Sequence, residues 1–510
     1  MSLIQDRTRN TLRFTLEDLD LFAQASHDWS PLHADDEYAY RTPYGARIAY
    51  GVQEELACLA ALPDRQGYSL AQVTVEFLHP LFVDFDYEVI TVSSGPEISE
   101  FRIYEGERLL VMGKALFRPG VPLEPSSAGA PIQARLKPAE FGADDLYKGR
   151  VAEGSYWPTG EALEMWMRRL RLREKGIGSI QVAALMWQTY LAGMELPGKH
   201  SLCQKLNMRF VETAGDRDLV AELIFRAEVA GYDARFNRMK AQAQLSAGGR
   251  TVAEAEVQAF LREPIEELTL QKVEAYLSRS NALNGQTAVV IGGSRGFGAA
   301  TALGLALQGC TVISVYRRSL EAAEQLAGLV PEGCGRIIPV QGDAANPRWC
   351  EEKAEELARL YGEPDLLVVG AGLPLLPSAL HADTLGQIQS YVSQSLALAG
   401  APLAAWAKRV AARKGWCAVL SAASVAEAPH EYPHFVAAKL SVEGLAAAAV
   451  KKHGGNLLIM RPPKMRTDLS NTPLGRYGSI PPEQAAADLV RRVLRKAESG
   501  GAFEIIDSSF

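Results

Sequence analysis

Asp28 and His33 lie five residues apart in the segment Ser26-His27-Asp28-Trp29-Ser30-Pro31-Leu32-His33. A carboxylate and an imidazole at this spacing, with a proline turn between them, can be brought to one small site. Together they could hold and activate a water molecule, or move a proton between carbon and oxygen. Both residues could instead serve only as turn and cap residues, a common role for Asp and His beside Pro. Spacing alone leaves both interpretations open.

A glycine-rich segment is the second candidate site. Gly292, Gly296 and Gly298 lie between an apolar run and an Ala-rich segment. Glycines between a strand and a helix let the backbone approach a pyrophosphate, which the helix N-terminus attracts. Arg317 and Arg318 follow the next apolar run, where an acidic residue would hold a ribose 2′-hydroxyl. Because arginines there favour a 2′-phosphate, the pattern predicts a site for NADP(H) over NAD(H).

Antiparallel strands and apolar helices are predicted to position the first site. Thr15 and Asp18 form a capping box before a helical apolar pattern, so a helix should end just before Asp28. Apolar helices are also expected over residues 51–61 and 177–192, each followed by alternating, strand-like runs. Those runs cover residues 72–77, 86–92, 108–112, 204–210, 219–225, 239–245 and 251–257. The predicted fold is an antiparallel sheet round a central helix, present twice.

The last part of the chain has a different pattern, in which short apolar runs alternate with helical segments. The runs cover residues 288–291, 311–315, 366–369, 417–420 and 457–460. This alternation predicts an α/β domain with a doubly wound parallel sheet of Rossmann type. We therefore expect four parts, namely the two antiparallel halves, a linker helix and the α/β domain. They span residues 1–130, 131–265, 266–284 and 285–510, and the first two meet at the Gly/Pro-rich stretch 126–131.

Composition narrows the class of protein. The chain has 510 residues, and at ~150 residues per domain this length allows two to four domains. Lys and Arg number 53 against 60 Asp and Glu, for a net charge of -7, which does not favour a nucleic-acid partner. We expect no membrane span, since no apolar stretch reaches ~18 residues, and residues 1–7 lack the apolar core of a secretion signal. Six scattered cysteines without a CxxC pair predict reduced thiols, no metal site and a cytoplasmic location.

The first site resembles a known family. The pattern Asp28-x-Ser30-Pro31-x-His33, followed by Ile48-Ala49-Tyr50-Gly51, resembles the MaoC-like (R)-specific enoyl-thioester hydratases and dehydratases over about residues 10–120. The resemblance implies a double hot-dog fold whose second half lacks the motif, and a site that needs no cofactor. It also implies that Asp28 and His33 are the acid/base pair acting across C2 and C3 of a 3-hydroxyacyl or 2-enoyl thioester. The backbone N–H of Gly51 would polarise the thioester carbonyl. Ser30 and Tyr50 stand where the family often has Asn and His.

The α/β region resembles the short-chain dehydrogenase/reductase family over about residues 285–510, through its glycine spacing, Asp343 after the third strand and Ala371-Gly372 after the fourth. The implied cofactor site comprises Gly292, Ser294, Arg295, Gly296, Phe297, Gly298, Arg317, Arg318, Asp343, Ala371, Gly372, Lys439 and Thr467. The resemblance implies catalytic roles for Ser424 and Lys439. Ser395 stands at the position of the family's Asn, and Phe435 at that of its Tyr.

A phenylalanine cannot donate a proton to a ketone oxygen, so Phe435 removes the protonation step of the family's reaction. Tyr432 lies three residues earlier and could replace it if it shared the same helix face. Otherwise the domain would bind NADP(H) weakly or not at all and would serve structure or partner docking.

The basic run Arg168–Lys175 has two possible roles. It could meet CoA phosphates or an acidic carrier protein, or it could form a solvated helix face, which is the commoner role of such runs. The apolar helix over 177–192 is expected in the core, with an acyl-tunnel lining as the alternative.

The predicted function is the dehydration or hydration of acyl thioesters carried on CoA or an acyl carrier protein, in fatty-acid or polyketide-type metabolism. One alternative is a bifunctional protein that also reduces 3-ketoacyl thioesters with NADPH. Another is a thioester-binding or acyl-transfer module with a non-catalytic Rossmann scaffold, because fold does not fix function. We expect a homo-oligomer and no nucleic-acid partner.

Overall fold

The computed structural model describes residues 5–129, 134–211, 219–262, 264–378, 380–382, 384–495 and 502–507. The chain forms two compact units, Met1–Pro264 and Ile265–Phe510. Within the described residues, none of the helices combines the length and the apolar character that crossing a membrane requires.

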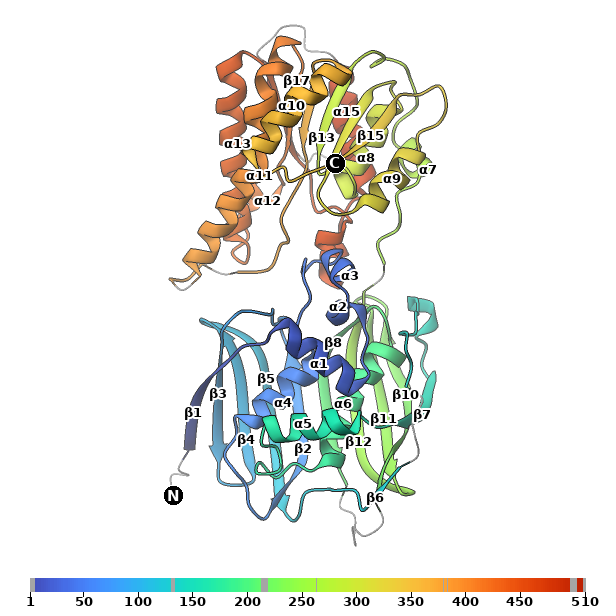
Figure 1. Cartoon of the computed structure of the whole chain (residues 1–510), viewed down its shortest axis with the longest axis vertical. Coiled ribbons are helices and arrows are strands. Elements are labelled where there is room, and N and C mark those ends of the chain that lie inside the picture. The colour runs from blue at the N-terminus through green and yellow to red at the C-terminus, as the bar shows by residue number, and fades with distance from the viewer. Residues whose placement is uncertain are drawn as a thin grey trace. The chain divides into compact units, whose positions relative to one another are not determined.

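The first unit is built on a ten-stranded sheet (Figure 1). Its strands, in spatial order, are β1 (Gln5–Leu12), β3 (Tyr87–Ser94), β4 (Ile98–Glu105), β5 (Arg108–Pro119), β2 (Tyr68–Phe77), β8 (Ser201–Phe210), β12 (Arg250–Leu261), β11 (Arg238–Ala247), β10 (Leu223–Asp233) and β7 (Val151–Tyr156). All neighbouring pairs are antiparallel. The order is symmetric about the central pair of β2 and β8, so the two halves repeat one arrangement. A short parallel pair, β6 (Ser127–Ala128) and β9 (Val220–Ala221), lies apart from this sheet.

Helices pack against one face of this sheet, and Figure 1 shows the longer ones in front of the strands. They are α1 (Leu16–Ser26), α4 (Gly51–Ala60), α5 (Gly160–Arg169) and α6 (Ser179–Tyr190), with the π-helix η2 (Leu191–Glu195). The short helices α2 (Pro31–Ala34) and α3 (Asp36–Tyr40) follow α1 along the chain, and the 3-10 turn η1 (Ala143–Asp145) precedes β7. Every residue of α6 is buried, which confirms the expected core position of this helix.

Six of the predicted antiparallel strands correspond to β2, β3, β5, β8, β11 and β12. The seventh, over 219–225, is wrong in its bounds, since it spans β9 and only the first three residues of β10. Three further strands, β1, β4 and β7, were not predicted. β1 and β7 form the two edges of the sheet, where charged residues such as Arg7, Arg9 and Glu153 are favoured, so their sequences lack an apolar strand pattern. Of the stretch predicted as a linker, Ala128 pairs with Ala221, and residues 130 and 131 lie outside the described residues.

The second unit has a seven-stranded parallel sheet, which confirms the Rossmann-type prediction. In spatial order the strands are β15 (Arg336–Gln341), β14 (Thr311–Tyr316), β13 (Thr287–Ile291), β16 (Leu366–Val369), β17 (Trp416–Leu420), β18 (Asn456–Arg461) and β19 (Phe503–Asp507). The connection changes direction between β13 and β16, so the loops after these strands flank the switch point where α/β sheets bind ligands.

Helices cover both faces of the parallel sheet (Figure 1). On one face lie α7 (Leu270–Glu274), α8 (Gly296–Ala306), α9 (Leu320–Gly328) and α15 (Pro482–Leu494), and on the other α10 (Pro347–Tyr361), α11 (Leu385–Ala412) and α13 (Pro433–His453). Short helices α12 (Ser424–Glu427), η4 (Asp468–Ser470) and α14 (Pro473–Arg476) complete the unit. The linker helix expected over 266–284 is shortened to α7, and Val273, Leu277 and Leu283 are buried in the core of this unit.

Candidate active site and nucleotide-binding site

The loop that carries Asp28 begins where α1 ends. His27 caps that helix in the left-handed conformation, with φ 56°, and turns the chain toward Asp28. Oδ1 of Asp28 accepts a hydrogen bond from the backbone N–H of Ser30 at 2.9 Å, which closes an Asx turn. Pro31 then opens α2, which carries His33. A turn and a one-turn helix thus fix both side chains within six residues of sequence.

Residues of helices from the second half of the first unit hold the Asp28 carboxyl. Thr189, at the end of α6, donates its hydroxyl to Oδ2 of Asp28 at 2.6 Å. Gly193, in η2, leaves room for the carboxyl, because a Cβ at this position would lie 2.3 Å from Oδ1. Asp28 is 1% exposed, and this burial raises its pKa to about 6, although the hydrogen bonds from Thr189 and Ser30 act in the opposite direction. The second half of the first unit, which lacks the motif, therefore holds the Asp28 carboxyl of the first half in place.

His33 is held in one tautomer by a backbone carbonyl. Its Nδ1 lies 2.8 Å from the carbonyl oxygen of Ile48, and because a carbonyl only accepts, Nδ1 carries the hydrogen and Nε2 the lone pair. The ring stacks on Tyr50 with centroids 4.2 Å apart, and the Tyr50 hydroxyl donates to the backbone oxygen of Asp28 at 2.9 Å. Burial lowers the pKa of His33 to about 4, so the imidazole is neutral at neutral pH.

The start of α4 supplies the third part of the site. Gly51 is the first residue of this helix, and helix N-termini carry N–H groups without intrahelical partners and a partial positive charge. A Cβ on Gly51 would lie 2.8 Å from Cζ of Phe77, so a larger residue would displace that ring. The glycine allows the close packing of β2 against the helix start.

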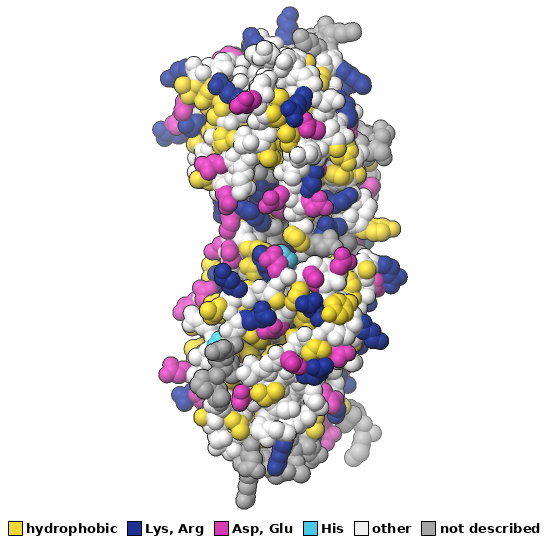
Figure 2. Space-filling view, turned by 90° about the vertical axis from the view of Figure 1, so that its right-hand side faces the viewer, with side chains coloured by type: hydrophobic (Ala, Val, Ile, Leu, Met, Phe, Trp, Pro, Cys, Tyr) yellow, Lys and Arg dark blue, Asp and Glu magenta, His cyan; other side chains and the backbone are white. Residues whose placement is uncertain are grey.

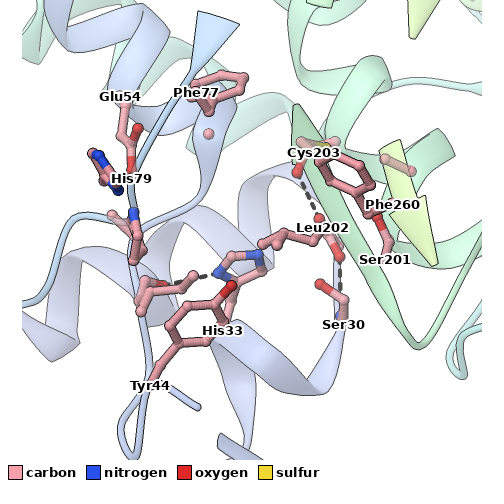
Figure 3. Close-up of a pocket in the computed structure, with 18 of the residues that line it drawn as sticks. Ser30, His33, Tyr44, Glu54, Phe77, His79, Ser201, Leu202, Cys203 and Phe260 are labelled. Carbon is pink, nitrogen blue, oxygen red and sulfur yellow. Dashed lines mark hydrogen bonds between the residues drawn. The ribbon is translucent and has the colours of Figure 1, made fainter. Parts of the chain in front are cut away.

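A cavity of about 150 Å³ brings these groups together. Its lining includes Asp28, Ser30, His33, Tyr44, Ile48, Ala49, Gly51, Glu54, Phe77, Leu78, His79, Pro80, Thr189, Ala192, Gly193, Ser201, Leu202, Cys203 and Phe260. Figure 3 shows His33 in the middle of this set, with Glu54 and His79 to one side and Ser30, Ser201 and Phe260 to the other. Thr189, Gly193, Glu54 and His79 were not predicted as site residues from the sequence. Only Glu54 left a signal, as a charged residue in a helix that is otherwise predicted to be buried.

The glycine loop of the second unit has the close packing that a phosphate site requires. Gly292 has φ +79°, and a Cβ there would lie 2.8 Å from Cα of Ala371. A Cβ on Gly298 would lie 2.1 Å from the carbonyl oxygen of Gly292. Gly296, with φ +52°, is the first residue of α8. These glycines let the loop pack closely against the segment after β16 and bring the N-terminus of α8 beside it. Because N–H groups in the first turn of a helix lack intrahelical partners, the residues present fit a dinucleotide pyrophosphate at this point.

The other predicted cofactor residues gather at the same edge of the sheet. Arg317 and Arg318 are exposed directly after β14, and Ala371 and Gly372 follow β16. Asp343 follows β15, and its carboxylate accepts from the N–H of Ala345.

Near the glycine loop, Arg295 is paired with Asp468 at 2.6 Å. Thr467 lies so close to Gly296 that a Cβ there would be 3.2 Å from its methyl carbon. Ser294 is half-buried in the loop and Phe297 is buried in α8.

The predicted catalytic residues of this unit lie on two helices in contact, Ser424 at the start of α12 and Lys439 on α13. Lys439 Nζ donates to the carbonyl oxygen of Leu420 at 2.8 Å and lies 5.5 Å from the ring centre of Phe435. Burial lowers the pKa of Lys439 to about 8. The Ser424 hydroxyl is buried and has no hydrogen-bond partner within the part of the chain that the structure describes. Tyr432 does not share the helix face of Phe435, because α13 begins at Pro433 and Tyr432 only caps it.

The basic run Arg168–Lys175 is neutralised by acidic neighbours. Arg168 and Arg173 contact Glu164, Lys175 contacts Asp64, and Arg169 contacts Asp18. Figure 2 likewise shows cationic and anionic side chains interspersed over one face of the molecule. These ion pairs favour the solvated-face interpretation of the run over a docking site for an acidic carrier.

Two family models match the chain, one in each unit. Residues 5–110 match the MaoC like domain, and residues 286–472 match the short chain dehydrogenase family. Versicolorin reductase 1 of Aspergillus parasiticus is 32% identical over 97 residues, which cover 19% of this chain and 37% of that protein. The 3-oxoacyl-[acyl-carrier-protein] reductase of Synechocystis is 36% identical over 92 residues, or 18% of this chain and 37% of that protein. The chain therefore matches little more than a third of the length of these relatives.

Longer matches are weaker in identity. The uncharacterized oxidoreductase YgfF of Escherichia coli is 28% identical over 233 residues, which cover 41% of this chain and 93% of that protein. A solved short chain dehydrogenase from Burkholderia cenocepacia, in complex with NADP, is 25% identical and covers 44% of this chain and 98% of its own, with a TM-score of 0.38. From the two family matches, the chain joins a MaoC-like domain to a short-chain dehydrogenase domain.

Proposed function

We propose that the MaoC-like domain interconverts 3-hydroxyacyl and 2-enoyl thioesters by removing or adding water. The observation that carries this proposal is one cavity lined by Asp28, His33 and Gly51. It combines a buried carboxyl, a neutral imidazole and a helix N-terminus, which are the groups that water addition beside a thioester carbonyl needs. The ten-stranded sheet would then be a double hot dog in which only the first half keeps the catalytic loop.

In the hydration direction, one water molecule would donate hydrogen bonds to the Asp28 carboxylate and to Nε2 of His33. Asp28 takes a proton from the water while the oxygen of that water bonds to C3. The electrons of the C2=C3 double bond move onto the thioester oxygen, and the N–H at the start of α4 stabilises that charge. Asp28 then gives the proton to C2, so protons balance and the enzyme is restored. Dehydration follows the same path in reverse.

The acyl chain would be carried on CoA or an acyl carrier protein, in fatty-acid or polyketide-type metabolism. The names of two relatives of the second domain, a 3-oxoacyl-[acyl-carrier-protein] reductase and a versicolorin reductase, support this setting. A homo-oligomer and a cytoplasmic location belong to the same proposal.

The second domain is proposed to bind NADP(H) through its glycine loop, with Arg317 and Arg318 at the 2′-phosphate. NADPH, when bound, supplies a hydride. Ser424 and Lys439 can hold and orient a carbonyl substrate, but Phe435 offers no proton, so we propose binding without efficient reduction.

A bifunctional protein is the second candidate, favoured by the unpartnered Ser424 hydroxyl. NADPH titration, followed by its oxidation with a 3-ketoacyl thioester, separates the two. If the protein does not bind NADPH at millimolar concentration, both the proposal of binding without reduction and the bifunctional candidate are rejected.

The hydration activity is tested by substitutions in the motif. Asp28→Asn and His33→Ala should each abolish hydration of a crotonyl thioester while the fold is kept. His27→Asn is a matched control, because His27 lies in the same loop but not in the cavity wall, and Asn tolerates its left-handed conformation. Activity retained in both motif variants would refute the assignment of the site.

A further inference from the structure

Glu54 places a carboxyl group in the wall of the cavity, on the first turn of α4 and three residues after Gly51. The residue is 3% exposed. Its carboxyl accepts a hydrogen bond from the backbone N–H of Leu81, and the described part of the chain sets no cation against it. Burial raises the pKa of Glu54 well above its ordinary value, so the group is a neutral acid with an O–H to donate.

The proposed water addition does not use this acid. Asp28 and His33 bind the water, Asp28 transfers the proton, and the N–H at the start of α4 stabilises the charge on the thioester oxygen. A buried polar group without a full set of partners costs stability, and an apolar residue of similar size would avoid that cost. When such an acid faces a ligand cavity, a hydrogen bond from its O–H to the ligand offsets this cost.

The wall near Glu54 also holds a histidine. Figure 3 shows His79 near Glu54 in the view, apart from Ser30 and Ser201. Burial and the positive charge of Arg108 lower the pKa of His79 to about 4, so His79 is neutral and adds no charge to the wall. Most of the remaining lining is apolar. A chain of methylene groups would leave the Glu54 O–H without a partner, whereas an oxygen-bearing chain would accept its hydrogen bond.

The volume of the cavity indicates how much of the acyl group its wall contacts. A space of about 150 Å³ holds roughly six non-hydrogen atoms, the size of benzene. The acyl atoms nearest the thioester are therefore the ones that this wall selects.

We infer that the cavity takes an acyl chain bearing an oxygen substituent beyond C3, and that the Glu54 O–H donates a hydrogen bond to that oxygen. The inference rests on the proposed function and names its substrate class: oxygenated acyl thioesters. Glu54 is then a specificity residue, and it takes no part in the proton transfer.

The test compares the binding of unreactive pantetheine thioesters by calorimetry, since both CoA and carrier proteins present a pantetheine arm. Two pairs match in shape, namely 4-oxopentanoyl with 4-methylenepentanoyl and 4-methoxybutanoyl with hexanoyl. We expect the full-length protein to bind the oxygen-bearing member of at least one pair about tenfold more tightly, as one buried hydrogen bond allows. Glu54→Leu should abolish or reverse this preference, whereas Glu54→Gln, which keeps an N–H donor, should retain most of it. Glu54→Met is a second apolar variant if Glu54→Leu does not fold.

Glu55→Gln is the matched control. Glu55 is the next residue of α4 and equally buried, but it does not line the cavity, so its variant should keep the preference of the unmodified protein. Equal binding within both pairs, or a preference that survives in the apolar variants, overturns the inference. A hundredfold loss of kcat on a crotonyl thioester in Glu54→Gln also overturns it, because Glu54 would then act in the chemistry. These ligands cannot react, so the binding result stands even if the Asp28 and His33 variants refute the hydration activity.

Discussion

The hydroxyl of Thr189 donates a 2.6 Å hydrogen bond to the carboxyl of Asp28, although 161 positions separate the two residues. The bond connects the motif loop of the first half-sheet to the last turn of α6 in the second. Both residues are buried, where a hydrogen bond to a charged acceptor is strong. The half without a motif is thus required to set the ionisation of Asp28.

This contact predicts a pH profile that one substitution should move. Asp28 must be ionised to take a proton from water, and its pKa is raised to about 6. Hydration should therefore fall as the pH drops through about 6, whereas His33 stays neutral down to about 4. Thr189→Val removes a hydrogen bond that favours the carboxylate, so the midpoint of kcat/KM should rise by about one pH unit.

Thr189→Ser is the control, since it keeps the hydroxyl and should keep the midpoint near its original pH. A Thr189→Val profile that loses amplitude without shifting along the pH axis would mean that Thr189 only shapes the loop.

Gly193 allows a steric test of how α6 and η2 position the Asp28 carboxyl. Gly193→Ala would place a Cβ 2.3 Å from Oδ1 of Asp28, so the carboxyl must move. We expect a fall in kcat of about 10²-fold, the size that a misplaced catalytic group costs. Gly160→Ala, at the start of α5 with nothing within 4 Å of its Cβ, should leave the rate unchanged. A Gly193→Ala protein with full activity would show that Asp28 tolerates displacement.

Much of this architecture could be predicted from local patterns. The glycine spacing and the apolar runs led to the parallel sheet and to its nucleotide edge, because both depend on residues that are neighbours in sequence. The capping box of Thr15 and Asp18 is present as expected. Motif residues Asp28 and His33 line one cavity for the same reason, since a single turn and Pro31 position them.

Contacts between distant segments could not be predicted in this way. Thr189 lies in α6, whose pattern indicates only a buried core, and Gly193 lies in the π-helix η2 that follows it. Their proximity to Asp28 follows from the pairing of β2 with β8. The edge strand β1 escaped detection because its residues are mostly polar. The position of Tyr432 depended on whether α13 begins before or after Pro433, and helix boundaries are the least certain feature of a sequence pattern.

Glu55 predicts a pH dependence of stability that is separate from catalysis. Burial raises its pKa from 4.5 to about 8, so the folded protein holds it neutral where the unfolded chain ionises it. The resulting penalty on folding is absent below pH 4.5, grows between pH 4.5 and 8, and is constant above. At pH 7 it amounts to about 3 kcal/mol.

Glu55→Gln cannot ionise, so its free energy of unfolding relative to that of the unmodified protein should increase by about 3 kcal/mol between pH 4.5 and pH 7. Urea unfolding at the two pH values measures this difference. A difference that is the same at both pH values would contradict the assignment of a buried neutral acid.

Phe435→Tyr tests the proposal that the second domain lacks a proton donor for reduction. The ring of Phe435 lies one turn before Lys439 on α13, with the ammonium nitrogen 5.5 Å from the ring centre. A nearby positive charge lowers the pKa of a phenol, which suits it to act as an acid on a ketone oxygen. We expect NADPH-dependent reduction of a 3-ketoacyl thioester to rise by about 10² to 10⁴-fold, the usual contribution of a positioned acid. Tyr432→Phe should change nothing, because Tyr432 precedes the helix. If Phe435→Tyr binds NADPH but gains no reduction, the missing phenol is not what limits this domain, and its substrate pocket must differ from that of a reductase.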